Sequence, residues 1–340
     1  MDIELNLPFE AKRIRKRDYS FWRYAHFFPY AKKTEIITLG EGWTPLVKFS
    51  NNLYFKLENL NPTGSFKDRG STTLISTLHR QIKNKRGLIT EDSSGNAGAS
   101  IAAYAARTKL KAEIYVPENV TGPKFNQIQF YGANVTRVSG TRSQVAEKAQ
   151  APEPRKFYLG HILHPLFRDG IRSLAYEIAE QLEWHIPESV YLPVSAGTLL
   201  LGVLQGFKHM VDSGVIDEMP KITACQTRQV SPLYHSIKKL HYKPPQRIDS
   251  IADALVSTNP PLLELMIKQL QMAKGDAVIV EETEILNAFK ELAEKGFFVE
   301  PSSAVAYAAY KKQTLKGKAP KTSSTAIILS GSGLKSSMSA

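Results

Sequence analysis

The feature that most constrains the fold of this chain is the alternation of strand-like and helix-like stretches along most of its length. Apolar runs such as 190–194, 222–225 and 326–329 do not alternate between apolar and polar residues. Strands of this kind are buried on both faces, as in parallel sheets that helices cover. The sequence therefore predicts an α/β protein with doubly wound, mostly parallel sheets. Other strands are expected at 53–57, 87–90, 112–116, 133–138 and 277–280, and helices at 68–83, 96–107, 123–130, 171–182, 199–210, 282–294 and 304–312.

The chain has 340 residues, which is long enough for two domains. We predict a smaller domain over residues 61–165 and a larger domain formed by 1–60 and 166–340. Pro152 and Pro154 lie in the stretch 150–160 between two blocks of alternating elements, and prolines interrupt regular structure, so we expect the boundary close to this stretch.

Composition excludes several classes of protein. Cys225 is the only cysteine, so the chain holds no internal disulfide framework, zinc finger or iron–sulfur cluster, and we expect no metal. A single cysteine also fits a reducing compartment, and we expect the cytoplasm. Residues 1–10 contain acidic side chains and no apolar core, and nowhere do 18 apolar residues run together. We therefore expect neither a signal peptide nor a membrane-spanning helix.

The chain is basic, with 44 Lys and Arg against 32 Asp and Glu and a net charge of +12. The densest basic run is 12–17, and elsewhere the basic residues are mixed with acids. Because no nucleic-acid-binding motif accompanies the run, we interpret it as a solvated or oligomer-facing surface and expect no nucleic-acid partner. A positive field does concentrate small anions, so the charge suits an anionic substrate.

Ligands of open parallel sheets bind at the carboxyl ends of strands, and four unusual stretches follow expected strands. The first is 61–70, where Lys67 lies just before or at the start of a helix. The helix dipole disfavours a cation there and lowers the pKa of an amine, which a nucleophilic lysine needs. Taken alone, an exposed loop lysine is the simpler interpretation.

The other three stretches each have two interpretations. Residues 93–98, Ser-Ser-Gly-Asn-Ala-Gly, form an anion cradle at a helix start or a plain N-cap. Residues 194–198, Val-Ser-Ala-Gly-Thr, let the backbone approach a phosphate or make a tight turn, and they match neither a P-loop nor the GxGxxG pattern. Residues 330–333, Ser-Gly-Ser-Gly, offer hydroxyls at a strand end or form a flexible turn.

Considered together, a loop lysine, an asparagine loop, a phosphate cradle and a terminal serine fit one ligand, pyridoxal 5'-phosphate. The segments that carry a wider resemblance are 19–24, 39–46, 56–70, 93–96, 300–304 and 329–335. On these segments the chain resembles the threonine synthase family of fold-type II enzymes over residues 19–335, and the Ser65-Phe66-Lys67-Asp68 motif is highly specific to that group.

The resemblance implies two domains with the cofactor between them, a mobile smaller domain that carries Lys67 and the asparagine loop, and a homodimer. Lys67 would carry the cofactor, Asn96 would bind its phenolic oxygen, and Ser330 would face its pyridine nitrogen. The cofactor phosphate would be held by backbone amides of Ser195, Ala196, Gly197, Thr198 and Leu199, and the substrate carboxylate by the loop of Ser93, Ser94 and Ala97. The aromatic segment 19–30 is a candidate dimer surface, with core packing as the alternative.

Two segments depart from the family pattern. The phosphate loop of the family is usually Gly-Asn-Gly-Gly-Asn, and here it reads Ser-Ala-Gly-Thr-Leu over 195–199. The family's Asn-Pro-Tyr-Arg-Leu-Glu-Gly, in which the arginine grips the substrate phosphate, corresponds here to His164-Pro165-Leu166-Phe167-Arg168-Asp169-Gly170. Arg168 is therefore the expected substrate-binding arginine, displaced by one position.

The activity that the resemblance implies is that of a pyridoxal-phosphate-dependent lyase that converts O-phospho-L-homoserine and water to L-threonine and phosphate. A serine hydroxyl at the ring nitrogen is a weak proton source, which favours elimination and replacement over transamination. Lys67, once displaced by the substrate amine, would act as the general base. The alternatives are a phosphoserine-dependent sulfhydrylase, a cysteate synthase or a threonine or serine dehydratase on the same scaffold. A catalytically silent regulator is a further alternative, against which Lys67 and Asn96 argue.

Overall fold

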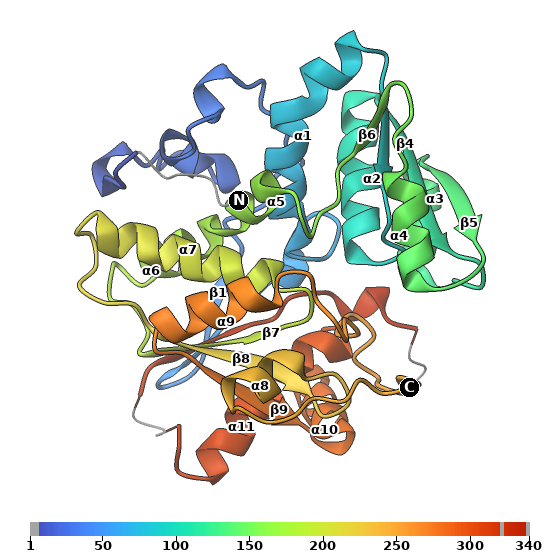
Figure 1. The fold of residues 1–340 in the computed structure, drawn as a ribbon. Helices are drawn as coiled ribbons and strands as arrows, with labels where there is room; N and C mark the ends of the chain where they lie inside the picture. Colours follow the sequence, from blue (N-terminus) through green and yellow to red (C-terminus); the bar gives the residue numbers. More distant parts are fainter. Residues whose placement is uncertain (1–6, 320–322, 338–340) are drawn as a thin grey trace.

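The computed structural model describes residues 7–319 and 323–337 and contains two sheets (Figure 1). In spatial order, the larger sheet consists of β1 (Leu46–Ser50), β2 (Leu53–Lys56), β10 (Thr325–Ile328), β7 (Ser189–Pro193), β8 (Lys221–Thr227) and β9 (Asp276–Val280). The smaller sheet consists of β5 (Asn134–Val138), β4 (Lys111–Pro117), β3 (Leu88–Glu91) and β6 (Lys156–Tyr158). All neighbouring strands are parallel except the β1–β2 hairpin, so the α/β prediction is confirmed.

Helices cover both faces of the six-stranded sheet, as its continuous apolar strands require. In Figure 1, α6, α7 and α9 lie on one side of this sheet and α10 and α11 on the other. The helices are α1 (Lys67–Asn84), α2 (Asn96–Thr108), α3 (Pro123–Phe130), α4 (Arg142–Gln150), α5 (Pro165–Ile171), α6 (Ser173–Gln181), α7 (Thr198–Asp212), α8 (Pro232–Ile237), α9 (Leu263–Met272), α10 (Glu282–Glu294) and α11 (Pro301–Leu315).

The structure differs from the sequence prediction in two places that matter for the site. The helix expected over 171–182 is α6, and a helix that was not expected, α5, directly precedes it and begins at a proline, which is favourable at a first helical position. The stretch 150–160, expected as a boundary, contains β6, which pairs with β3. The chain therefore stays in the smaller sheet as far as Tyr158. The division at 61–165, and the mobility of that part, remain predictions.

The aromatic N-terminal segment packs into the core. Its 3₁₀ helix, Phe21–Phe27, buries nearly all of its side chains, and the Trp22 indole donates a hydrogen bond to Thr72 at 2.9 Å. Core packing is thus the correct interpretation for these rings, although Tyr19 is 73% exposed. The basic run 12–17 lies mostly at the surface, where Glu10 forms ion pairs with Lys12 and Arg13.

Within the described part of the chain, no helix has the length and apolar character needed to cross a membrane. The thiol of Cys225 is buried and forms no disulfide. Residues 1–6, on which part of the signal-peptide expectation depends, lie outside the described residues.

Candidate functional site

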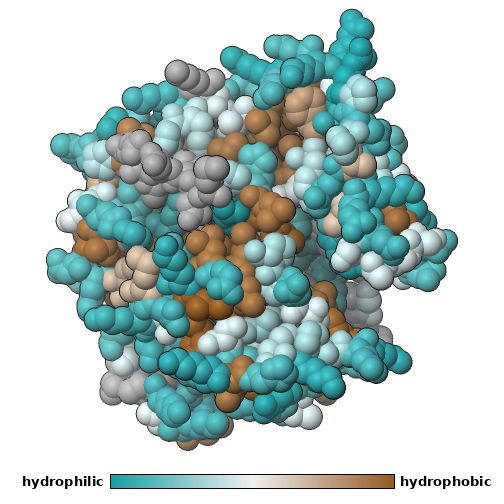
Figure 2. All heavy atoms as spheres, in the orientation of Figure 1, coloured by the Kyte–Doolittle hydropathy of each residue, from teal (hydrophilic) through white to brown (hydrophobic). Residues whose placement is uncertain are grey.

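A cavity of about 420 Å³ opens where strands of both sheets end. The loops after β3 and β7 line it, together with the start of α1, residues 253–257 and Ser330 beyond β10. Figure 2, in the orientation of Figure 1, shows the surface hollowed between the part that contains α3 and α4 and the body beneath it. Carboxyl ends of parallel strands are where open α/β sheets bind ligands, so the topology itself points to this cavity.

The structure gathers all but one of the predicted site residues around this cavity. Those that line it are Lys67, Ser93, Ser94, Asn96, Ala97, Ser195, Ala196, Gly197, Thr198, Leu199 and Ser330. Arg168 is the exception. Residues from the four stretches that follow expected strands therefore meet at one cavity, as their assignment to a single ligand requires.

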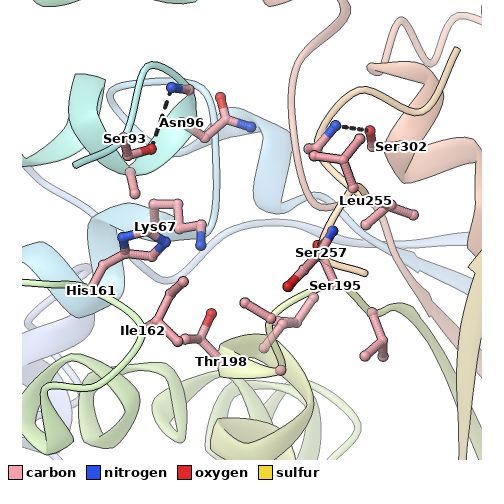
Figure 3. A pocket seen from close by; sticks show the side chains of 18 of the residues that line it. Lys67, Ser93, Asn96, His161, Ile162, Ser195, Thr198, Leu255, Ser257 and Ser302 are labelled. Carbon is pink, nitrogen blue, oxygen red and sulfur yellow. Dashed lines mark hydrogen bonds between the residues drawn. The ribbon is translucent and has the colours of Figure 1, made fainter. Parts of the chain in front are cut away.

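Lys67 is the first residue of α1, and its amine points into the cavity between the loops that carry Asn96 and Ser195 (Figure 3). Its Nζ lies 4.9 Å from the ring centroid of Phe66 and 5.8 Å from that of Phe167. Burial lowers the pKa of Lys67 to about 8, although nearby carboxylates partly oppose the effect. An amine that is more readily neutral is a better nucleophile and a better general base.

Asn96 begins α2 and contacts a carboxylate from the other half of the molecule. Its Nδ2 lies 3.1 Å from both carboxylate oxygens of Glu300, the residue that precedes α11. Lys124 also pairs with Glu300, at 3.1 Å, and with Asp253, at 2.8 Å. The Asn96 Oδ1 is buried without a hydrogen-bond partner, so this amide retains hydrogen-bonding capacity at the cavity.

Ser330 is held next to the start of α1 by backbone contacts. The Phe66 amide donates to the Ser330 carbonyl at 3.1 Å, and Ser65 forms an antiparallel bridge with Gly331. The Ser330 hydroxyl lies 3.0 Å from the hydroxyl of Ser303. These contacts fix the terminal serine and the loop lysine relative to each other.

The predicted phosphate loop, 195–199, includes the first two residues of the 15-residue helix α7. Gly197 has φ +96°, and a Cβ there would lie 2.4 Å from the sulfur of Met266, so this position requires glycine. The Ser257 amide donates to the Ser195 hydroxyl at 3.3 Å. The first amides of a helix have no acceptor within it, so those that follow Gly197 are suited to an anion.

Arg168 does not line the cavity. Its side chain is 3% exposed, and its Nη1 donates to the carbonyls of Ile162 and Leu163 at 3.0 and 3.1 Å. Ile162 itself lines the cavity, so the observed contacts support the loop rather than reach the ligand space. A direct contact between Arg168 and substrate remains a prediction.

Other residues that the sequence did not single out as site residues also line the cavity, and His161, Glu300 and Arg142 are among them. His161 lies beside Lys67 in Figure 3, and its Nδ1 is 2.7 Å from Glu91 Oε1. Glu300 contacts Asn96, as described above, and Arg142 pairs with Asp92 at 2.7 Å. The Glu-Pro-Ser-Ser-Ala segment was a signal for Glu300, whereas nothing local distinguishes His161 or Arg142.

The residues present fit pyridoxal phosphate. A buried amine, an asparagine side chain whose Nδ2 can donate a hydrogen bond, a glycine-dependent helix start and a hydroxyl at a strand end surround one cavity. Each matches a different part of that cofactor: the aldehyde, the phenolic oxygen, the phosphate and the pyridine nitrogen.

Comparisons with known proteins also indicate a pyridoxal-phosphate-dependent enzyme. The family model described as "Pyridoxal-phosphate dependent enzyme" matches residues 37–331. The threonine synthase of Methanocaldococcus jannaschii is 34% identical over 98% of this chain and 84% of that protein. The solved serine racemase of Dictyostelium discoideum is 28% identical with a TM-score of 0.66, over 85% of this chain and 92% of the other. A threonine deaminase from Solanum lycopersicum shares the fold, with a TM-score of 0.73 at 21% identity, over 96% of this chain and 91% of that chain.

Proposed function

The chain belongs to the pyridoxal-phosphate-dependent enzymes and, within them, to the threonine synthase family, and we propose that it converts O-phospho-L-homoserine and water to L-threonine and phosphate. The observation that carries the proposal is the meeting of Lys67, Asn96, the start of α7 and Ser330 around one cavity. The relative from Methanocaldococcus jannaschii, matched over nearly the whole chain, supports this choice among the lyases of the family.

The cofactor would be held by four groups. Lys67 would carry it, Asn96 would donate to its phenolic oxygen, and Ser330 would face its ring nitrogen. The amides of residues 195–199 would bind its phosphate, and the loop of Ser93, Ser94 and Ala97 would bind the substrate carboxylate. When bound, pyridoxal phosphate withdraws electrons from the substrate and makes the hydrogens at Cα, and then at Cβ, acidic.

Lys67 would move the protons of the reaction. It would remove protons from Cα and Cβ as phosphate leaves Cγ, and it would return protons to Cγ and Cα as the hydroxyl of water adds at Cβ. The remaining proton of the water balances the departed phosphate, which is released as hydrogen phosphate. A pKa of about 8 suits both tasks, because such an amine accepts and releases protons near neutral pH. The neutral hydroxyl of Ser330 would leave the ring a moderate electron sink, which suits elimination and addition.

The test uses purified enzyme and O-phosphohomoserine. We expect stoichiometric release of phosphate and threonine, and borohydride should fix the cofactor to the peptide that contains Lys67. Labelling of a different lysine would falsify the assignment of Lys67. Release of phosphate from O-phosphoserine but not from O-phosphohomoserine would replace the proposed substrate.

One observation favours a second candidate, a dehydratase acting on threonine or serine. Such an enzyme needs no site for a substrate phosphate, and Arg168, the arginine expected for that phosphate, does not line the cavity. Formation of 2-oxobutyrate from threonine, with no phosphate released from O-phosphohomoserine, would establish this candidate.

We also propose a homodimer in the cytoplasm. The resemblance to the family supports the dimer, and the single buried cysteine fits a reducing compartment. Sedimentation of the purified enzyme tests the dimer, and a mass of about 38 kDa, that of one chain, would exclude it.

A further inference from the structure

We propose that Arg142, oriented by Asp92, binds the distal anionic group of the substrate. This assignment rests on the proposed function and names the residue that recognises a phosphorylated amino acid. It starts from the position of Arg168, whose guanidinium contacts the backbone at 162 and 163 and does not line the cavity. If a phosphorylated substrate binds in this cavity, a cationic side chain other than Arg168 has to contact its phosphate.

Among the described residues that line the cavity, Arg142 is the only arginine. The lysine in that lining, Lys67, is assigned to the cofactor, and the ring of His161 is paired with Glu91. Lys124 is not among the lining residues, and its amine forms ion pairs with Asp253 and Glu300. Arginine is also the side chain best suited to a phosphate, because its planar fork donates two parallel hydrogen bonds.

The Arg142 guanidinium is held in place by a buried partner. Its Nη2 lies 2.7 Å from Asp92 Oδ2, and the Asp92 side chain is only 8% exposed. The other carboxylate oxygen of Asp92 accepts a hydrogen bond from the Tyr158 hydroxyl at 2.5 Å. Asp92 is therefore fixed from the opposite side, and it positions one end of the guanidinium.

Two further facts favour a role in binding over a purely structural ion pair. Arg142 is the first residue of α4, where the helix dipole disfavours a cation, so the position is costly for the helix alone. Asp92 directly precedes Ser93 and Ser94, the loop proposed to bind the substrate carboxylate. An amino acid whose carboxylate is bound by this loop would thus have Arg142 along the same wall of the cavity.

The test compares holoenzyme variants on two substrates and on inorganic phosphate. Arg142→Gln removes the charge, and Arg107→Gln, an exposed arginine of α2 that does not line the cavity, is the matched control. A charge-assisted hydrogen bond corresponds to roughly a 10- to 150-fold effect, and because Arg142 is 51% exposed we expect about tenfold. Arg142→Gln should therefore raise KM for O-phosphohomoserine about tenfold with a smaller change in kcat. Its pyridoxal phosphate content and its turnover of threonine, where wild type shows any, should stay unchanged.

Calorimetric titration with inorganic phosphate separates this proposal from the proposed function. If wild type binds phosphate and Arg142→Gln binds it about tenfold more weakly, Arg142 is an anion-binding residue even if O-phosphohomoserine is not turned over. If Arg142→Gln matches Arg107→Gln in KM and in phosphate affinity, the proposal is wrong. It is equally wrong if Arg142→Gln loses activity on both substrates alike, or if wild type binds no phosphate.

Discussion

The lowered pKa of Lys67 makes the stability of the cofactor-free protein depend on pH in a defined direction. The ordinary lysine value is 10.5, and burial lowers the pKa of Lys67 to about 8 in the folded chain. Between these two values the unfolded chain holds a proton that the folded chain has released. Stability therefore rises with pH across this window, and the contribution is absent below about pH 8 and complete above about pH 10.5.

The magnitude follows from the same two pKa values. Between pH 7 and pH 9.5 the gain in the free energy of unfolding from this one lysine is about 2 kcal/mol. Lys335 contributes in the same direction, because burial also lowers its pKa to about 8. The comparison therefore has to be between the wild type and Lys67→Met, since both retain Lys335.

The assay is urea unfolding of both cofactor-free proteins at pH 7 and pH 9.5. We expect the stability of wild type relative to Lys67→Met to increase by about 2 kcal/mol from the lower to the higher pH. An unchanged difference would mean that Lys67 is solvated or ion-paired in the folded chain. The interpretation of this lysine as a readily neutral amine would then be refuted.

Three further outcomes are expected. Gly197→Ala should raise the Kd for pyridoxal phosphate more than about tenfold in an absorbance titration, because the new Cβ meets a methionine sulfur and φ is +96°; unchanged affinity would remove the loop from the phosphate site. Arg69→Met should lower the free energy of unfolding by about 3–5 kcal/mol, because it leaves the buried Glu58 without its ion-pair partner and Glu177 with Lys56 alone; a loss below about 1 kcal/mol in urea unfolding would contradict this. Ser330→Ala should retain the cofactor but lower kcat by roughly 2- to 12-fold, as expected for one neutral hydrogen bond; unchanged turnover would exclude Ser330 as the ring partner.

The parts of the site that sequence could predict are those in which local turn chemistry follows an expected strand. The glycine at 197, the asparagine at 96 and the serine at 330 each sit where a strand ends, and the topology of a parallel sheet brings such ends together. Lys67 was different, because a cation at a helix start was a weak signal that also fitted an exposed loop lysine, and only the resemblance carried by Ser65-Phe66-Lys67-Asp68 gave it a role.

The position of Arg168 could not be predicted, because a displacement by one residue changes the face of a helix. Neighbouring residues of an α-helix point about 100° apart. Phe167, at the family's arginine position, packs near Lys67, whereas Arg168 turns to the carbonyls of 162 and 163. Arg142 and Glu300 were missed as site residues because their contacts join segments far apart in the chain, such as Asn96 with Glu300.

The contacts of Lys67 and Asn96 also bear on the predicted division of the chain. The backbone around Lys67 is joined to the end of β10 through residues 65, 66, 330 and 331, and the Arg69 guanidinium is fixed between Glu58 and Glu177 with all three side chains fully buried. These anchors belong to the six-stranded sheet and its helix α6. Asn96 contacts Glu300, the residue before α11, through its side chain. The start of α1 is therefore tied to the larger sheet by these contacts and to α2 by the Ser100 hydroxyl, which donates to Asp68 at 2.6 Å. Whether the division falls at residue 61 stays a prediction.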